Sequence, residues 1–219
     1  MVLLIALLLI QTPPLPHDGC VLEGTVTLRN NGERVSGAEL TQLVVYLKDG
    51  PPRARPEPQT HTMRQQNFEF QPRSMVVLLN DSIEFVNAES DTTLHSVFSQ
   101  RGDNPFPGAV NERKTTFKQA FTKEGSVHVQ CNIHEWMQAD VLVLRSASFV
   151  HPDEHGNWRL TGLERRAYTL VAWEPNGGEE RRQVSACASG PIQLALVKKT
   201  PPLPLRRDGS RYRPEYETF

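Results

Sequence analysis

Residues 131–137, "CNIHEWM", place a thiol, an imidazole and a thioether three positions apart. They directly follow "GSVHVQ", in which apolar and polar residues alternate, so the sequence predicts a β-strand that ends at Cys131. Because side chains alternate between the two faces of a strand, Val127, Val129 and Cys131 share the face toward the core, and His128 points outward. The stretch therefore predicts a buried metal site at the end of a strand.

One thiolate, two imidazoles and a weak axial thioether form the ligand set of copper sites for electron transfer. The second imidazole is best supplied by "LHSVFS", at the end of another predicted strand among apolar neighbours. The sequence thus predicts one copper ion with four ligands: His95, Cys131, His134 and Met137. Other histidines lie in polar stretches rich in proline or glycine and are expected to be exposed to solvent: His17, His61, His151 and His155.

Two alternatives to copper stay open. Zinc also binds one cysteine and two histidines, although methionine is a poor zinc ligand and copper takes an axial methionine readily. Alternatively, a buried Cys131, an exposed His134 and a core Met137 meet by chance, since C-x2-H-x2-M alone is a moderately specific pattern.

The composition favours an all-β protein. The chain has 219 residues, with 17 prolines and 14 glycines, and short segments of period-two hydrophobicity recur along it. Such strands, separated by Asn-Asp and Gly turns, predict β-sandwiches. The formal net charge of −1 indicates neither nucleic acid nor an acidic lipid surface as a partner.

The N-terminus carries nine unbroken apolar residues, 2–10, which three prolines then interrupt. This run is too short to span a bilayer and favours a signal peptide over residues 1–18, with a periplasmic or otherwise exported mature chain. Neither a preceding Lys or Arg nor an A-x-A cleavage site accompanies it, and a buried first strand is the alternative. The rest of the sequence contains no segment apolar enough to cross a membrane.

The chain has three cysteines. If a metal holds Cys131, an oxidising compartment would pair Cys20 with Cys187 and join the start of the mature chain to its end. The alternative is two unpaired buried thiols.

A proline-rich stretch divides the predicted strands. "GPPRARPEPQT" predicts a linker, placed at residues 50–63, and a block of strands follows over residues 64–145, with residues 100–114 as its long loop. The flanking blocks, 19–49 and 146–198, are each too short to close a sandwich. We therefore expect them to form one discontinuous sandwich around the inserted one.

The sequence beyond residue 198 is rich in proline and arginine and has little to bury. Residues 199–219 are therefore predicted to be a disordered tail.

Residues 64–145 resemble a cupredoxin, the Greek-key β-sandwich of blue copper proteins such as plastocyanin and amicyanin. The resemblance is carried by "FEFQP", "NDSIEFVN", "HSVFS", "FTKEGSVHVQC" and "MQADVLVL". The short C-x2-H-x2-M loop is most similar to that of amicyanin. The resemblance implies a single type 1 copper ion and electron transfer.

Residues 19–198 as a whole resemble the bacterial periplasmic plastocyanin-like proteins labelled methylamine utilisation proteins. In these, a cupredoxin lies between segments of a carboxypeptidase-regulatory-like domain, whose pattern is similar to "EGTVTLRNNGERVSGAELTQLVVYL" and "DEHGNWRLTGLERRAYTLVAW". The resemblance implies a transthyretin-like or Ig-like outer sandwich without catalytic residues.

The ligand loops depart from the cupredoxin pattern at three positions. Many cupredoxins place Asn after the first His ligand and Ser or Thr after the Cys, whereas this chain has Ser96 and Asn132 there. We expect their hydroxyl and amide to pair across the two loops, with two solvated side chains as the alternative. Trp136 either shields the metal, offers a partner surface or only packs.

The favoured function is one-electron transfer between redox partners that the sequence does not identify. The alternative is copper handling by a periplasmic chaperone, store or sensor, although the four methionines form no tract. An enzyme is not expected, because Gln130 and Asn132 flank Cys131 where copper oxidases and nitrite reductases place His, and no H-x-H pair occurs. A G-x-S-x-G hydrolase motif is also absent from the sequence.

Overall fold

A computed structural model of the chain describes residues 19–51, 57–176, 178–188, 190–201 and 203–212. These residues form the strands β1 to β17 and one short 3-10 helix, η1, so the predicted all-β fold class is confirmed. The predicted signal peptide, residues 1–18, lies outside the described residues. In the described part of the chain, no helix is long and apolar enough to cross a membrane.

The first and last described segments build one sandwich together. One of its sheets has the order β14-β1-β17, with β2 paired to β1, and the other has the order β13-β3-β15-β16. Its elements are β1 (Cys20–Asn30), β2 (Glu33–Arg34), η1 (Gly37–Gln42), β3 (Val44–Leu47), β13 (Phe149–Val150), β14 (Asn157–Leu163), β15 (Ala167–Glu174), β16 (Gly178–Ser185) and β17 (Ile192–Val197). We call this unit the outer sandwich.

The intervening segment builds a second sandwich, which we call the inner sandwich. Its sheets have the orders β10-β7-β4-β5 and β6-β12-β11-β8-β9. Its strands are β4 (Thr60–Gln66), β5 (Glu69–Gln71), β6 (Ser74–Leu78), β7 (Ser82–Asn87), β8 (His95–Gly102), β9 (Phe106–Asn111), β10 (Thr116–Ala120), β11 (Gly125–Cys131) and β12 (Gln138–Leu144).

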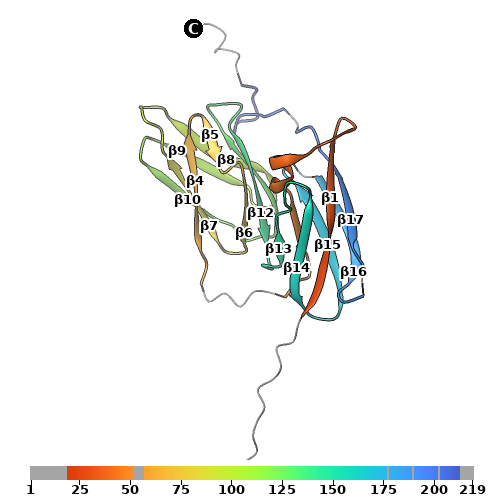
Figure 1. The fold of residues 1–219 in the computed structure, drawn as a ribbon. Coiled ribbons are helices and arrows are strands. Elements are labelled where there is room, and N and C mark those ends of the chain that lie inside the picture. Colours follow the sequence, from red (N-terminus) through yellow and green to blue (C-terminus); the bar gives the residue numbers. More distant parts are fainter. Residues whose placement is uncertain (1–18, 52–56, 177, 189, 202, 213–219) are drawn as a thin grey trace, which may run out of the picture.

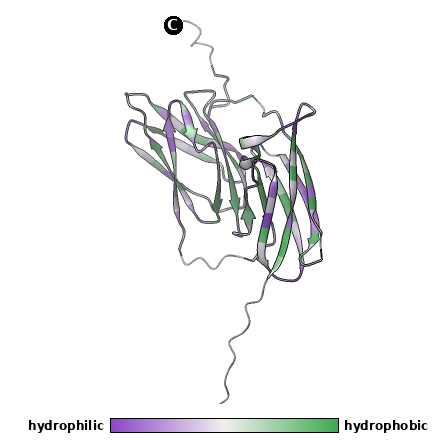
Figure 2. Cartoon of the chain, in the orientation of Figure 1, coloured by the Kyte–Doolittle hydropathy of each residue, from purple (hydrophilic) through white to green (hydrophobic). Residues whose placement is uncertain are grey.

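Each sandwich has its own apolar core, and a third apolar cluster joins them. In this cluster, Val171 and Trp173 of β15 pack with Leu142 and Leu144 of β12. Figure 1 shows the two sandwiches side by side, and Figure 2 shows hydrophobic strand segments within both and between them. Because these outward-facing apolar residues are buried, the two sandwiches share an interface and are not connected through a linker alone.

Two segments that the sequence assigns to irregular structure contain strands. β9 lies inside the predicted long loop 100–114, and β4 begins at Thr60, inside the predicted linker 50–63. β9 pairs with β8 in spite of its proline and glycine because Gly108 has φ +73°, and a Cβ there would lie 1.5 Å from Val97 O. β4 forms because it pairs in parallel with β7 and buries Met63.

The tail also differs from its prediction. The sequence predicts disorder over residues 199–219, of which 202 and 213–219 lie outside the described residues. Residues 203–212 are held against the inner sandwich by hydrogen bonds of Arg207 and Tyr212, and we call this segment the C-terminal strap. A turn closed by the bond from Arg206 N to Ser210 O, at 2.8 Å, shapes it. Composition does not reveal such a segment because the strap is held by individual hydrogen bonds rather than by an apolar face.

A disulfide closes the outer sandwich. Cys20, at the start of β1, is bonded to Cys187, which follows β16, and the two cysteines are 167 positions apart in sequence with Cα atoms separated by 4.9 Å. The loop of sequence that this disulfide closes thus contains most of the described residues, including the inner sandwich. Cys131 is the free cysteine among the described residues.

Removing this disulfide is expected to destabilise the fold. The double variant Cys20→Ser/Cys187→Ser should lower the free energy of unfolding by about 3 kcal/mol, because a long loop in the unfolded chain is no longer closed. Urea unfolding with and without reductant measures the effect. A reductant that destabilises the double variant as much as the natural chain would contradict this explanation.

Glu174 ends β15 with only 3% of its surface exposed. Burial raises the pKa of its carboxyl; the hydrogen bond from Asn176 and the charge of Lys198 oppose the rise, and the neighbouring Asp140 adds to it. The pKa of Glu174 is higher in the folded than in the unfolded chain. The stability of the fold therefore decreases as the pH rises from the unfolded-state pKa through the folded-state pKa.

The variant Glu174→Gln should therefore melt at a higher temperature than the natural chain at about pH 7.5 and at a similar temperature at about pH 4, where the carboxyl is protonated. Thermal unfolding followed by circular dichroism at both pH values measures this, with the exposed Glu33→Gln as control. Equal melting shifts at the two pH values would contradict the role of ionisation.

Candidate metal centre

The pairing of β8 with β11 positions the candidate ligands. The antiparallel register sets Cys131 opposite Val97, so the end of β11 lies beside the start of β8 at His95. The backbone N–H of Asn132 continues this pairing and donates to Ser96 O at 2.7 Å. Two ligand-bearing segments far apart in sequence are therefore joined at one edge of the inner sandwich.

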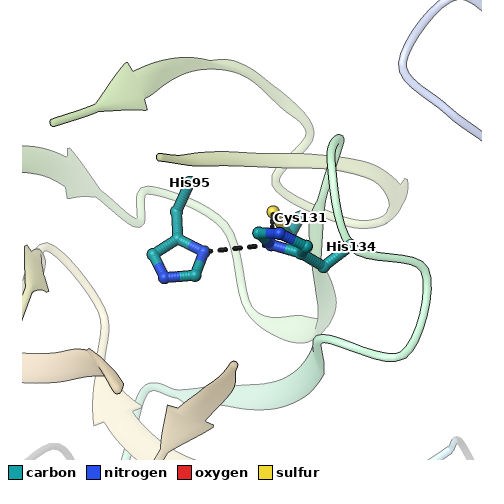
Figure 3. A group of neighbouring side chains, drawn as sticks. All are labelled: His95, Cys131 and His134. Atoms are coloured by element: carbon teal, nitrogen blue, oxygen red, sulfur yellow. Dashed lines mark hydrogen bonds between the residues drawn. The ribbon is translucent and has the colours of Figure 1, made fainter. Parts of the chain in front are cut away.

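Three donor atoms converge at this edge. The ligand atoms of His95, Cys131 and His134 all lie within 4.8 Å of one another. The two Nδ1 atoms are 3.2 Å apart, and His134 Nδ1 lies 3.7 Å from the sulfur of Cys131. Figure 3 shows both imidazoles and the sulfur pointing toward one another. Within the described residues, no other group of three His, Cys, Asp or Glu side chains has ligand atoms this close.

All three side chains are withdrawn from water. His95 and Cys131 are fully buried, and His134 is 5% exposed. Two buried imidazoles that face each other through the same ring nitrogen, beside a thiol, fit a small soft cation, since each atom is a good donor to copper or zinc. The residues present therefore fit a metal of this class.

Met137, the fourth predicted ligand, closes the loop. Its carbonyl accepts a hydrogen bond from Cys131 N at 3.1 Å, and its N–H donates to His134 O at 3.2 Å. The side chain is 1% exposed and belongs to the same apolar core as Cys131. Coordination by its thioether remains a prediction.

Burial governs the protonation of the three donors. It lowers the pKa of His95, partly offset by Glu89, and together with the neighbouring His95 it lowers the pKa of His134 to about 4. Burial also raises the pKa of the Cys131 thiol, in opposition to backbone N–H donors around the sulfur. At neutral pH both imidazoles are therefore neutral and ready to ligate, whereas a metal must displace the thiol proton.

Two backbone N–H groups point at the sulfur of Cys131. Ser96 N and Ile133 N each lie 3.5 Å from it. Such donors stabilise negative charge on the sulfur and limit its movement. They come from the two ligand segments, so the sulfur is held from both sides.

Sequence reasoning missed Glu89, which orients His95. Its Oε1 lies 3.0 Å from His95 Nε2, and its carboxylate also accepts hydrogen bonds from Asn67 N and Phe68 N, each at 3.0 Å. Burial raises the pKa of the Glu89 carboxyl, but these hydrogen bonds lower it by more. The pKa of Glu89 therefore lies below its usual value. A carboxylate behind a ligating histidine fixes the ring and its tautomer, leaving Nδ1 free for a metal.

Buried amides support the loop before His95. Asn87 Nδ2 donates to Thr93 O and to Asn111 O, both at 2.9 Å, and Asn111 Nδ2 donates to Gln65 Oε1 at 3.0 Å. Asn87, Asn111 and Gln65 are at most 1% exposed. The hydrogen bonds of Asn87 and Asn111 in the core favour one conformation of the segment that carries the ligand.

Two aromatic side chains cover His134. Phe68 contacts its ring edge to face at 5.0 Å between centroids, and Trp136 lies at 5.7 Å. Phe68 is 40% exposed and Trp136 is 56% exposed. Trp136 thus contacts a ligand ring and is also exposed to solvent, while its role as a shield or a partner surface remains a prediction. Phe68 was missed because it lies far from the ligand loop in sequence.

The predicted pairing of the Ser96 hydroxyl with the Asn132 amide is not what joins the two loops. The joining bond is the backbone one from Asn132 N to Ser96 O, while Asn132 Oδ1 accepts from Arg207 N of the C-terminal strap at 2.7 Å. Side-chain pairing is unnecessary because the strand register already places the two backbones at hydrogen-bond distance.

The other described histidines lie outside the cluster. His128 points away from the core as predicted and pairs with Asp140 at 2.9 Å. His61 is not freely solvated, because its Nε2 lies 2.9 Å from the buried Asp81. His151 lies 2.9 Å from Leu43 O, and His155 is exposed.

Comparisons with known proteins found similar solved structures only. No protein family and no curated protein matches the chain. A purple cupredoxin from Nitrosopumilus maritimus is 14% identical over 38% of this chain and 98% of its own, with a TM-score of 0.33. A Cu(I) amicyanin variant is 15% identical over 38% of this chain and 81% of its own, with a TM-score of 0.32.

A copper-containing nitrite reductase from Thermus scotoductus is also similar, at 19% identity over 53% of this chain and 28% of its own, with a TM-score of 0.35. The expectation that the chain is not an enzyme is corrected by this finding, because the similar structures include an enzyme beside the cupredoxins.

The contact between Glu89 and His95 predicts a role in metal affinity. Glu89→Gln should weaken Cu(II) binding about tenfold, because the charged partner that orients the imidazole is lost. Titration of the apo-protein against a competing chelator measures this, with Glu84→Gln on β7 as a matched control. Equal affinities of the two variants would show that Glu89 has no such role.

Proposed function

We propose that this chain is a type 1 copper protein that carries single electrons between redox partners. The observation that supports it best is the buried group of His95, Cys131 and His134, with ligand atoms within 4.8 Å of one another. Copper supplies the one-electron change between Cu(II) and Cu(I) when bound. Met137 would add its thioether to these donors, which favours copper over zinc in this donor set.

The chain's part in electron transfer is to keep its donors still. Glu89 holds His95, two backbone N–H groups hold the sulfur of Cys131, and the loop bonds of Met137 hold His134. A site that does not rearrange between oxidation states exchanges electrons with little reorganisation. Burial also excludes water from the metal, which protects the thiolate.

The route to a partner is proposed to run through the aromatic cover. His134 is nearly buried, whereas Phe68 and Trp136 contact its ring and reach the surface. An unidentified redox protein docking on these two side chains would come within a short distance of the site. The near-neutral net charge of −1 argues against strong electrostatic steering of that encounter.

We further propose that the protein works outside the cytoplasm, in the periplasm or after export. The disulfide between Cys20 and Cys187 supports this location, because such bonds persist in oxidising compartments. The outer sandwich is proposed to be a carboxypeptidase-regulatory-like unit, built from residues 19–49 and 146–198 around the inserted cupredoxin at 64–145.

Addition of Cu(II) to the apo-protein tests the copper proposal. The protein should develop an intense visible thiolate-to-copper band with a type 1 EPR spectrum, and a mild reductant should bleach the band reversibly. Cys131→Ala should abolish the band, because the thiolate supplies the transition. The exposed His155→Gln should leave it unchanged. A colourless protein that binds Zn(II) or Cu(I) instead would contradict electron transfer.

A further inference from the structure

The C-terminal strap contacts the metal-binding loop at its thiolate ligand. The hydroxyl of Tyr212 donates to Cys131 O at 2.5 Å, and Arg207 N donates to Asn132 Oδ1 at 2.7 Å. These bonds cross 81 and 75 positions of sequence. The strap therefore binds the two residues at which β11 enters the loop.

The bond of Tyr212 is one half of a continuous hydrogen-bond chain. The peptide group between Cys131 and Asn132 accepts from Tyr212 through its carbonyl and donates through its N–H to Ser96 O at 2.7 Å. Hydrogen bonds at both ends of one peptide group polarise and strengthen each other. Tyr212 thus reinforces the contact that joins the ligand segments of β8 and β11.

The strap is anchored well enough to hold that position. Arg207 Nη1 donates to Pro107 O at 3.0 Å, and Gln100 Nε2 donates to Arg207 O. Within the strap, Asp208 accepts from Ser210 N at 2.9 Å and closes the turn between the two anchor points. Tyr212 is partly buried by these contacts. Its phenol is protonated at neutral pH and so remains a donor.

We propose that Tyr212 and Arg207 are positioning residues, through which the C-terminal strap holds the peptide group of the thiolate ligand and so sets the properties of the metal centre. The inference rests on the proposed function where it concerns copper, whereas the mechanical contact is a property of the chain itself.

Loss of the Tyr212 hydroxyl has two expected consequences. The Cys131–Asn132 peptide group becomes freer, so copper should leave the loop more easily. The hydroxyl dipole that now donates to the carbonyl oxygen of Cys131 is also lost, and near the site this dipole stabilises the more negative, reduced form. The reduction potential should therefore be lower without it.

The test compares Tyr212→Phe with Tyr168→Phe in the full chain. Tyr168 is a matched control, since its hydroxyl also bonds to backbone, at Glu164, but in the outer sandwich. Tyr212→Phe should lose Cu(I) to a chelator about fivefold faster, lower the potential and shift the thiolate-to-copper band. Tyr168→Phe should change none of these.

Hydrogen exchange of the apo-protein provides a readout without copper. In Tyr212→Phe, the amide of Asn132 should exchange about fivefold faster than in the natural chain, because its bond to Ser96 is weakened. If the natural chain shows no visible band with copper, but Tyr212→Phe still exchanges the Asn132 amide faster than the natural chain does, the copper function is refuted and the positioning role of the strap is supported.

A second variant covers the whole segment. A chain that ends at residue 202 removes both anchors and should show the same changes more strongly. If Tyr212→Phe and the shortened chain both keep the natural band, potential, copper release rate and Asn132 exchange, the strap inference is overturned while the copper function stands.

Discussion

The pairing of β8 with β11 is the constraint on which the site depends. Its register places Cys131 opposite Val97, and the last bond of the ladder, from Asn132 to Ser96, holds the two ligand segments together. A shift by one residue would turn Cys131 from the core to the opposite face, because side chains alternate along a strand. The apolar residues of both strands prevent that shift, so the packing of the inner core and the convergence of the donors have the same cause.

Polar groups buried around the ligands complete this arrangement. Glu89 behind His95, the backbone N–H groups at the sulfur and the amides of Asn87 and Asn111 all have partners. In an interior of low dielectric, such groups stabilise one geometry strongly because each alternative would leave a polar atom without a partner. The cluster of donors is thus preorganised by the chain, and the apolar interface with the outer sandwich lies on β12, next to the ligand strand β11.

The sequence was informative where chemistry and periodicity coincide. The alternation before Cys131 predicted its inward direction, and the spacing of Cys131 and His134 within one short loop predicted that they meet. His95 was identified because its neighbours in sequence are apolar and predict a strand. Glu89 and Phe68 were missed because their contacts depend on how separate loops fold over each other, which no local pattern encodes. The strand β9 was missed because proline and glycine indicate a loop unless a partner strand demands the positive φ of Gly108. The strap was missed because single hydrogen bonds leave no compositional signal.

The strand order of the outer sandwich has a consequence for biogenesis. Apart from the short β2, the partners of β1 are β14 and β17, and β3 pairs with β13 and β15, so these two strands complete their sheets only after the inner sandwich has been synthesised. During synthesis, β1 and β3 therefore lack their main partner strands, whereas all strands of the inner sandwich have been made by Leu144. The connectivity thus allows an order of folding in which the metal-binding sandwich forms first. The strands that precede and follow it in sequence then pair to complete the outer sandwich. Until that closure, the unpaired edges of β1 and β3 can pair with other chains and so promote aggregation.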